Sequence, residues 1–313
     1  MTVNRTSQAA PVPAPGSAAA NLRGIAWMLV TGLLFVGVTG VVRHLGSDMS
    51  PMQAAFIRYV FGVVLIAPVF LRRGGRARLF SGESLRSRRL GLHAVRGLVH
   101  GTGVMLWFYA MARIPIAEVT SLGFTAPIFT TIGAALFLGE RLSAHRIGAV
   151  LIGFGGAMII LRPGFEAIST GALAQLAAAP LFATSFLITK KLTETESSAS
   201  IVAHLTIFVT LALLPAALMN WRTPSWEELG WLCATAVFAT LGHLALTQAL
   251  RATHITVTQP FAFLQLVWAT LLGFYVFGEQ PEIWIWIGGA VIVASASYMA
   301  RRESLARGPR SRR

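Results

Sequence analysis

The stretch "FLGERLSAHRIGAVLIGFGGAMI" at residues 137–159 has a counterpart at residues 277–299, "FGEQPEIWIWIGGAVIVASASYM". The shared Gly-Glu pair fixes the alignment, because Gly139–Glu140 stands 139 residues before Gly278–Glu279. A self-match at a constant offset is the signature of a duplicated structural unit. We therefore predict that the chain contains two copies of one unit.

Other parts of the chain support the same duplication. The offset of 139 also aligns "YAMARIPIAEV" (109–119) with "QALRATHITVT" (248–258). Residues nearer the start of each copy align at an offset of 147: Leu34–Phe35 with Leu181–Phe182, Arg43 with Lys190, and Pro68 with Pro215. An arginine-rich segment in the first copy, at residues 72–89, accounts for the difference between the two offsets.

The composition is that of a membrane protein. Of the 313 residues, 55% are hydrophobic and 12% are charged, whereas soluble domains carry about 25% charged residues. Apolar runs approach the roughly 20 residues needed to cross a bilayer. We predict ten spans, at 24–42, 52–71, 90–111, 116–138, 145–162, 171–190, 199–219, 228–250, 255–277 and 282–300.

Each copy therefore holds five spans, and an odd number forces the two copies to insert in opposite orientations. The predicted fold class is an all-α membrane protein with ten transmembrane helices arranged as two inverted five-helix repeats. The first repeat covers residues 22–164 and the second covers residues 165–302. The Ala/Pro/Ser-rich residues 1–21 are expected to be a disordered cytoplasmic segment, and residues 303–313 a basic cytoplasmic tail.

Basic residues orient the chain. With both termini in the cytoplasm, 20 of the 26 Lys and Arg residues fall in inside segments and four in outside segments. This bias follows the positive-inside rule and predicts a bacterial-type inner membrane protein with both termini cytoplasmic. It also explains the net charge of +14 without a nucleic-acid partner, so the expected partners are the lipid bilayer and a small molecule. A homo-oligomer is also compatible with the sequence.

At this point the chain resembles a known family. Ten spans in two repeats, with "YAMARIPIAEVTSLGFTAPIFTTIGAALFLGERLSAHRIGAVLIGFGGAMIILRPG" at 109–164, are similar to the EamA-type branch of the drug/metabolite transporter superfamily. The resemblance implies secondary transport of a small polar or zwitterionic metabolite by alternating access. Family substrates include riboflavin, amino-acid-like compounds, S-adenosylmethionine and metal-chelating metabolites. The sequence leaves the substrate, the direction of transport and the coupling ion open.

The third span carries two ionisable residues one helical turn apart, Arg96 and His100. Helical spacing places them on one stripe with Gly103 and Trp107. Lipid cannot satisfy a guanidinium group, so this stripe is expected to face protein or a water-filled cavity. Two roles stay open for Arg96, because it could bind substrate or extend its charge to the cytoplasmic headgroups. His100 lies deeper and is predicted either to line the cavity or to hydrogen-bond a neighbouring helix.

Two further ionisable residues lie nearer the outer face. Arg58 is predicted either to tie helix ends together or to bind a carboxylate or phosphate with its planar fork. Glu118 opens the fourth span, where a carboxylate complements the helix dipole. The alternative is that Glu118, like His100, is a proton-coupling site, since buried ionisable groups in spans often relay protons.

Aromatic and amide groups complete the predicted binding residues: Trp107, Tyr109, Gln265 and Trp268. Gln265 and Trp268 are three residues apart in the ninth span, so both can touch one ligand. We expect Arg96, His100, Trp107, Gln265 and Trp268 to line one cavity shared by the third and ninth spans. Packing in the protein core is the alternative role for the aromatic side chains.

The chain shows no H-E-x-x-H, G-x-S-x-G or Walker A motif. No cofactor, metal site or catalytic residue is therefore predicted, and the chain is not expected to be an enzyme. Two alternatives remain beside the carrier. One is a membrane-embedded enzyme that uses His100, His243 and Glu118, and the other is a channel or a purely structural membrane protein.

Overall fold

The computed structural model describes residues 18–46, 49–71, 87–126, 128–130, 144–162, 168–219, 221–253, 258 and 261–306. In this part of the chain the regular structure is helical, without strands. The bounded helices are α1 (Ala18–Leu45), α2 (Pro51–Leu71), α3 (Leu90–Met111), α4 (Ile116–Gly123), α6 (Ala144–Leu161), α7 (Thr170–Leu192), α8 (Ser198–Met219), α9 (Trp226–Ala252), α11 (Leu264–Phe277) and α12 (Ile283–Ala306). Apart from α4 and α11 they follow the predicted spans closely, and the all-helical class is confirmed.

The helices have the length and surface of membrane spans. Five of those described, α1, α2, α7, α8 and α9, are long and apolar enough to cross a bilayer on their own. Outward-facing apolar side chains are strongly exposed, for example Leu98 at 61%, Leu151 at 66% and Val276 at 64%. Apolar exposure on this scale is costly in water and favourable in lipid. The helix surfaces therefore fit a bilayer.

Local sequence signals set several helix ends. The Ser225 hydroxyl accepts a hydrogen bond from the Glu228 N–H, and the Glu228 carboxylate accepts one from the Ser225 N–H. This capping box satisfies two N–H groups that a helix start otherwise leaves without partners. Ser169 caps α7 in a similar way through the Ala172 N–H. Helix α11 ends at Gly278, whose φ of 65° lies in the left-handed region that glycine adopts without strain.

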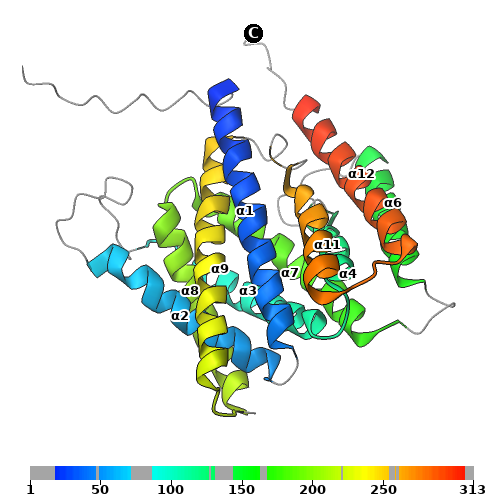
Figure 1. Ribbon diagram of the computed structural model, residues 1–313. Helices are drawn as coiled ribbons and strands as arrows, with labels where there is room; N and C mark the ends of the chain where they lie inside the picture. Colours follow the sequence, from blue (N-terminus) through cyan, green and yellow to red (C-terminus); the bar gives the residue numbers. More distant parts are fainter. Residues whose placement is uncertain are drawn as a thin grey trace, which may run out of the picture.

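Helices of one repeat pack mainly on helices of the other, and the pattern is two-fold symmetric (Figure 1). The contact of α1 with α9 corresponds to that of α7 with α3. The pairs α2–α8 and α6–α12 join equivalent helices. Such a pattern is expected when the second repeat is related to the first by a two-fold axis.

In each repeat a glycine packs against a phenylalanine ring, and the two glycine–phenylalanine pairs occupy equivalent positions. A Cβ added at Gly103 of α3 would lie 3.2 Å from the Phe182 ring of α7, and one added at Gly242 of α9 would lie 2.8 Å from the Phe35 ring of α1. The two glycines are 139 residues apart and the two phenylalanines 147 apart. Both offsets are those of the sequence repeat, so the structure confirms that alignment.

Two basic side chains fix equivalent helix ends. The Arg43 Nη1 donates to the Met111 carbonyl at 2.9 Å, at the end of α3. The Lys190 Nζ donates to the Leu250 carbonyl at 3.0 Å, near the end of α9. Terminal carbonyls lack partners within their own helix, so each cation supplies a missing donor. The sequence repeat aligns Arg43 with Lys190 and Met111 with Leu250.

Small residues bring two pairs of helices unusually close. Gly97 of α3 packs on α8, because a Cβ added there would stand 2.3 Å from the Phe208 Cβ. Helices α6 and α12 cross at Gly156 and Gly288, where a Cβ on either glycine would lie within 2.8 Å of the other's carbonyl oxygen. The Ser295 hydroxyl adds a hydrogen bond to the Ala149 carbonyl in the same crossing. Small-residue contacts of this kind are typical of membrane helix pairs.

The fourth span of each repeat differs from the prediction. The helix predicted over 116–138 is not continuous, because α4 ends at Gly123 and Phe124–Thr125 form a turn. There the Thr125 hydroxyl donates to the Leu122 carbonyl, a local bond that competes with helix continuation. In the second repeat residues 261–262 are helical, Phe263 forms a turn, and α11 then begins at Leu264, inside the span predicted over 255–277. The equivalent rings of Phe124 and Phe263 meet edge to face at 5.0 Å.

Candidate functional site

Four aromatic rings from four helices form a row at the interface of the repeats. In order they are Phe35 of α1, His243 of α9, His100 of α3 and Phe182 of α7. Neighbouring ring centroids lie 5.3, 5.4 and 5.3 Å apart, and the rings meet edge to face. Edge-to-face rings at this spacing attract each other. The glycines that admit the two phenylalanines also position the row.

Two buried arginines lie beside this row. Arg96, one turn before His100 on α3, is 3% exposed, and its Nη1 donates to the Ile201 carbonyl of α8 at 3.0 Å. Arg58 of α2 is 6% exposed, and its Cζ lies 4.2 Å from the centre of the Tyr59 ring. Both guanidinium charges interact with the imidazole of His243. The centre of the molecule therefore carries concentrated positive charge.

Several donors in this cluster lack partners. Within the described residues, the Arg58 Nε, the Tyr59 hydroxyl and the Arg96 Nε are buried without a hydrogen bond. Burying such an atom away from water without a hydrogen bond costs about 1–3 kcal/mol. Two of these donors belong to the guanidinium groups themselves, and together with the Tyr59 hydroxyl they form a site suited to a ligand with acceptor oxygens or nitrogens.

A small pocket opens on the same cluster. Its lining includes Arg58, Tyr59 and His243 together with the hydroxyl-bearing Thr206 and Thr240. Its volume is about 10 Å³, which is room for about one water molecule. A metabolite thus enters this site only when the surrounding helices separate.

The structure brings together some of the predicted site residues and adds others. Arg96, His100 and Arg58, predicted on separate grounds, share one cluster. Tyr59 and Ser185 were not predicted, although the Ser185 hydroxyl lies 3.1 Å from the His100 Nδ1. His243 appeared only in the enzyme alternative. The repeat offers a signal for it, because Gly242 aligns with Gly103, which places both histidines within one turn of equivalent glycines.

Two predicted residues on α3 lie away from the cluster. Trp107 is two turns beyond His100, where its ring packs against that of Phe108 at 5.4 Å. The Tyr109 hydroxyl donates to the Thr170 Oγ1 at 3.1 Å, at the start of α7. The Arg113 guanidinium covers the Tyr109 ring at 3.6 Å. Both aromatic side chains thus have packing partners near the end of α3.

The structure places the remaining predicted residues on other helices. Gln265 and Trp268 lie against α1 at Gly32, where an added Cβ would stand 3.1 Å from the tryptophan ring. Helix α11 packs chiefly on α1 and α4, so the expected direct meeting of the third and ninth spans is not the main packing of this region. Glu118 is half-buried in the first turn of α4.

Comparison with known proteins agrees with this architecture. The chain is 32% identical to a riboflavin transporter of Vibrio cholerae over 90% of its length and 94% of the relative's. It is 27% identical to an S-adenosylmethionine uptake transporter of Rickettsia bellii, with coverage of 90% and 95%. A solved crystal structure shares the fold, with a TM-score of 0.59 at 18% identity, over 91% of this chain and 98% of the other. Residues 22–162 and 169–301 each match the EamA-like transporter family, and the chain belongs to that family.

Proposed function

We propose that this membrane transporter carries riboflavin or a related flat heterocycle, and that the ring row with Arg58 and Arg96 forms its binding site. The observation that carries the proposal is the group of unpartnered buried donors beside the four rings. Two relatives named riboflavin transporters, from Vibrio cholerae and Brucella anthropi, are 32% and 33% identical to this chain. Their similarity and the chemistry of the cluster support the same substrate class.

The chemistry of the cluster separates the candidate substrates. A flavin presents a flat aromatic face to the rings, and its carbonyl oxygens and ring nitrogens accept hydrogen bonds from guanidinium and hydroxyl groups. S-adenosylmethionine also has a flat adenine ring and a carboxylate, but it carries a sulfonium cation, which two nearby guanidinium charges would repel. An amino-acid-like or metal-chelating metabolite would use the arginines through a carboxylate but would leave the ring row without a role.

Transport by alternating access follows from the position of the site. The cluster lies where the two repeats meet, the usual place for the substrate site of a carrier built from inverted repeats. Its small volume means that the helices must separate on one side and then on the other to load and release substrate. A channel would need a continuous path, and an enzyme would need a chemical product, so counterflow of unchanged substrate distinguishes the carrier from both.

The orientation is part of the proposal, with both termini in the cytoplasm of a bacterial cell. Cys233 is the single cysteine, so a Cys233→Ser background allows site-specific labelling. An impermeant maleimide added to sealed cells should label a cysteine at Thr223, which is exposed in the α8–α9 connection. The same reagent should leave a cysteine at Ser81 unlabelled until the cells are opened. Labelling of Ser81→Cys in sealed cells would show that the orientation is the opposite of the one proposed.

Proton coupling through His100 and Glu118 is also proposed. An unperturbed histidine titrates near pH 6.5, and both groups lie within helices of the first repeat. We expect His100→Gln or Glu118→Gln to change the pH dependence of uptake. If both variants keep the wild-type pH profile, neither residue couples protons to transport.

The decisive experiment is uptake of radiolabelled riboflavin into proteoliposomes that contain the purified chain. We expect saturable uptake, counterflow with internal riboflavin, and little competition from S-adenosylmethionine. His243→Ala should reduce riboflavin affinity at least tenfold, whereas His44→Ala, at an exposed histidine outside the cluster, should leave it unchanged. Absence of saturable uptake, or stronger competition by S-adenosylmethionine than by riboflavin, would refute the flavin assignment.

A further inference from the structure

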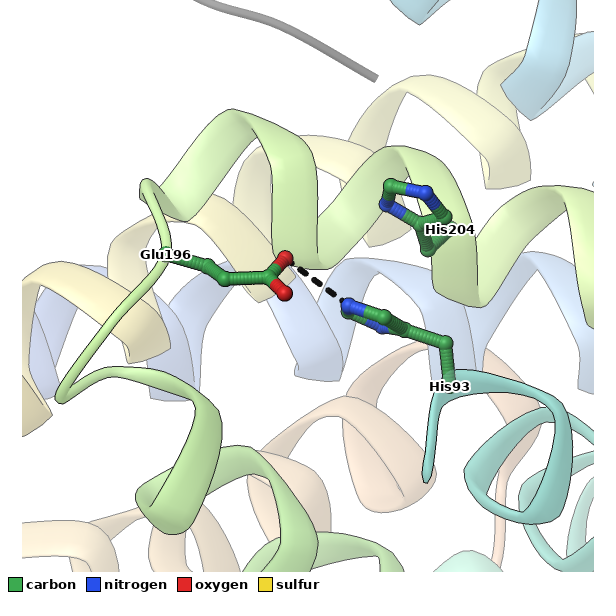
Figure 2. A group of neighbouring side chains, drawn as sticks. All are labelled: His93, Glu196 and His204. Atoms are coloured by element: carbon green, nitrogen blue, oxygen red, sulfur yellow. Dashed lines mark hydrogen bonds and ion pairs between the residues drawn. The ribbon is translucent and has the colours of Figure 1, made fainter. Parts of the chain in front are cut away.

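Three side chains outside the transport site converge where α3 begins and where α7 is joined to α8. They are His93 of α3, Glu196 of the α7–α8 connection and His204 of α8 (Figure 2). One nitrogen or oxygen atom from each lies within 4.8 Å of the atoms from the other two. His93 is fully buried and His204 is 4% exposed. Protein therefore encloses the two histidines, while Glu196 lies in the connection between two helices.

The bonds within the group prepare its atoms for a cation. The His93 Nε2 lies 2.8 Å from the Glu196 Oε2, and the Ser87 hydroxyl donates to the Glu196 Oε1. Burial raises the pKa of Glu196, but the hydrogen bonds from Ser87, His93 and Ser200 outweigh it, and the pKa lies below its ordinary value. Glu196 is therefore a carboxylate at neutral pH.

The imidazole of His204 has the arrangement of a metal ligand. Its Nδ1 lies 2.9 Å from the Ser200 carbonyl oxygen, which can only accept, so Nδ1 carries the proton and donates. The other nitrogen, Nε2, then has a free lone pair. Histidines that bind metals commonly donate their second N–H to a backbone carbonyl, which holds the ring in position. The His93 and His204 rings stack with centroids 4.2 Å apart, and one ligand atom from each ring lies within 4.8 Å of the other.

From this geometry we propose that His93, Glu196 and His204 bind one divalent transition-metal ion, with zinc as the preferred ion. Two imidazoles and one carboxylate form a ligand set that zinc accepts, with water in the fourth position. With bonds of about 2.0–2.2 Å, tetrahedral ligand atoms stand about 3.4 Å apart. The atoms need to move by about 1 Å, which side-chain rotation provides. Calcium and magnesium prefer oxygen ligands and should bind weakly.

A bound ion would connect the two repeats. His93 belongs to the first repeat, and Glu196 and His204 belong to the second. All three lie near the helix ends that the proposed orientation places in the cytoplasm. The ion would thus join α3 to the start of α8 on that side, in place of the His93–Glu196 hydrogen bond.

The test uses the full chain in detergent with its affinity tag removed, because a polyhistidine tag would itself bind zinc. Equilibrium dialysis against zinc chloride should give one ion per chain, and cobalt chloride should give the visible absorption bands of a tetrahedral site. His204→Ala and Glu196→Gln should weaken zinc binding at least tenfold. His44→Ala, which removes a histidine outside the group, should bind as the wild type does.

Each result decides the proposal. A raised melting temperature of the wild type with zinc, absent in Glu196→Gln, supports it, since a ligand of the folded state stabilises that state. The wild-type dialysis and the cobalt spectrum do not depend on the folding of any variant. If the wild type does not bind zinc stoichiometrically, the proposed site is wrong, and the group is an ordinary ion pair beside a ring stack. Unchanged binding by both His204→Ala and Glu196→Gln would also overturn it.

Discussion

Helix α3 carries a histidine in each of two polar regions, and the regions differ in their charge balance. At its first turns, His93 pairs with the Glu196 carboxylate at 2.8 Å. Two turns later, His100 lies between rings and near two arginines. In the described part of the chain, neither Arg58 nor Arg96 forms an ion pair with a carboxylate. The end region has its counter-charge within the protein, whereas at the proposed binding site a ligand would supply it.

The largest effect is expected at Arg96, because its substitution by alanine removes a charged donor from the central region. Arg96→Ala should abolish riboflavin uptake. Arg96→Lys keeps the charge but loses the planar fork, and a hydrogen bond to a charged group is worth about 1.5–3 kcal/mol. Affinity should therefore fall about ten- to a hundredfold, measured as initial uptake at matched membrane abundance. Normal transport by Arg96→Ala would end the binding role of this residue.

A second prediction concerns the glycine that lies between the two regions. An Ala side chain at Gly97 would place its Cβ 2.3 Å from the Phe208 Cβ and 3.0 Å from its backbone. Overpacking of this kind costs about 1–3 kcal/mol, so Gly97→Ala should lower the melting temperature by several degrees. Gly91→Ala is the matched control on the same helix, since nothing lies within 4 Å of its added Cβ. Equal melting temperatures for the two variants would contradict the close packing of α3 on α8.

A smaller effect is expected from acid at the end region. The pKa of Glu196 in the folded chain lies below its ordinary value of 4.5. Its ionised form therefore adds stability above that value, and this contribution is lost as the pH falls through the lower folded-state pKa. Melting temperatures of the wild type and Glu196→Gln should differ at pH 7, and the difference should shrink as the pH falls below 4.5. A constant difference down to pH 3 would show that the Glu196 charge is not responsible.

The smallest effect is expected at Trp268, which lies against Gly32 of α1. Trp268→Phe keeps an aromatic ring, and we expect it to change riboflavin affinity by less than threefold. Trp268→Ala should cost less affinity than His243→Ala, as measured by competition in the uptake assay. A larger loss for Trp268→Ala would place the ligand near α11 and support the cavity predicted between the third and ninth spans.

The repeat and the spans could be predicted because they depend on local patterns. Apolar length fixes the spans, and a constant offset identifies equivalent positions such as Arg43 and Lys190, which the structure shows in equivalent bonds. The depth of Arg96 and His100 also follows from their place in the span. Helical spacing correctly indicated that both face protein, and both are buried.

The partners of these residues could not be predicted, because they depend on how helices cross. His100 meets His243 only because α1, α3, α7 and α9 pack in alternation between the repeats. A sequence gives the face of each helix but not which faces meet. The turn at Phe124 was missed for a different reason. It rests on local hydrogen bonds of Thr125, and hydropathy does not register these within an apolar run.

The close crossing of α6 and α12 has a consequence for motion. Their backbones touch at Gly156 and Gly288, so neither helix can approach, and the bond from Ser295 resists sliding. When one repeat rotates against the other as a rigid body, a contact of this kind acts as the fulcrum. Displacement then grows with distance from the crossing, and it is largest in α2 and α8 on the far side of the molecule (Figure 1). The central rings and arginines lie partway along this lever, so under the proposed transport cycle a modest rotation would open the site to a flat substrate.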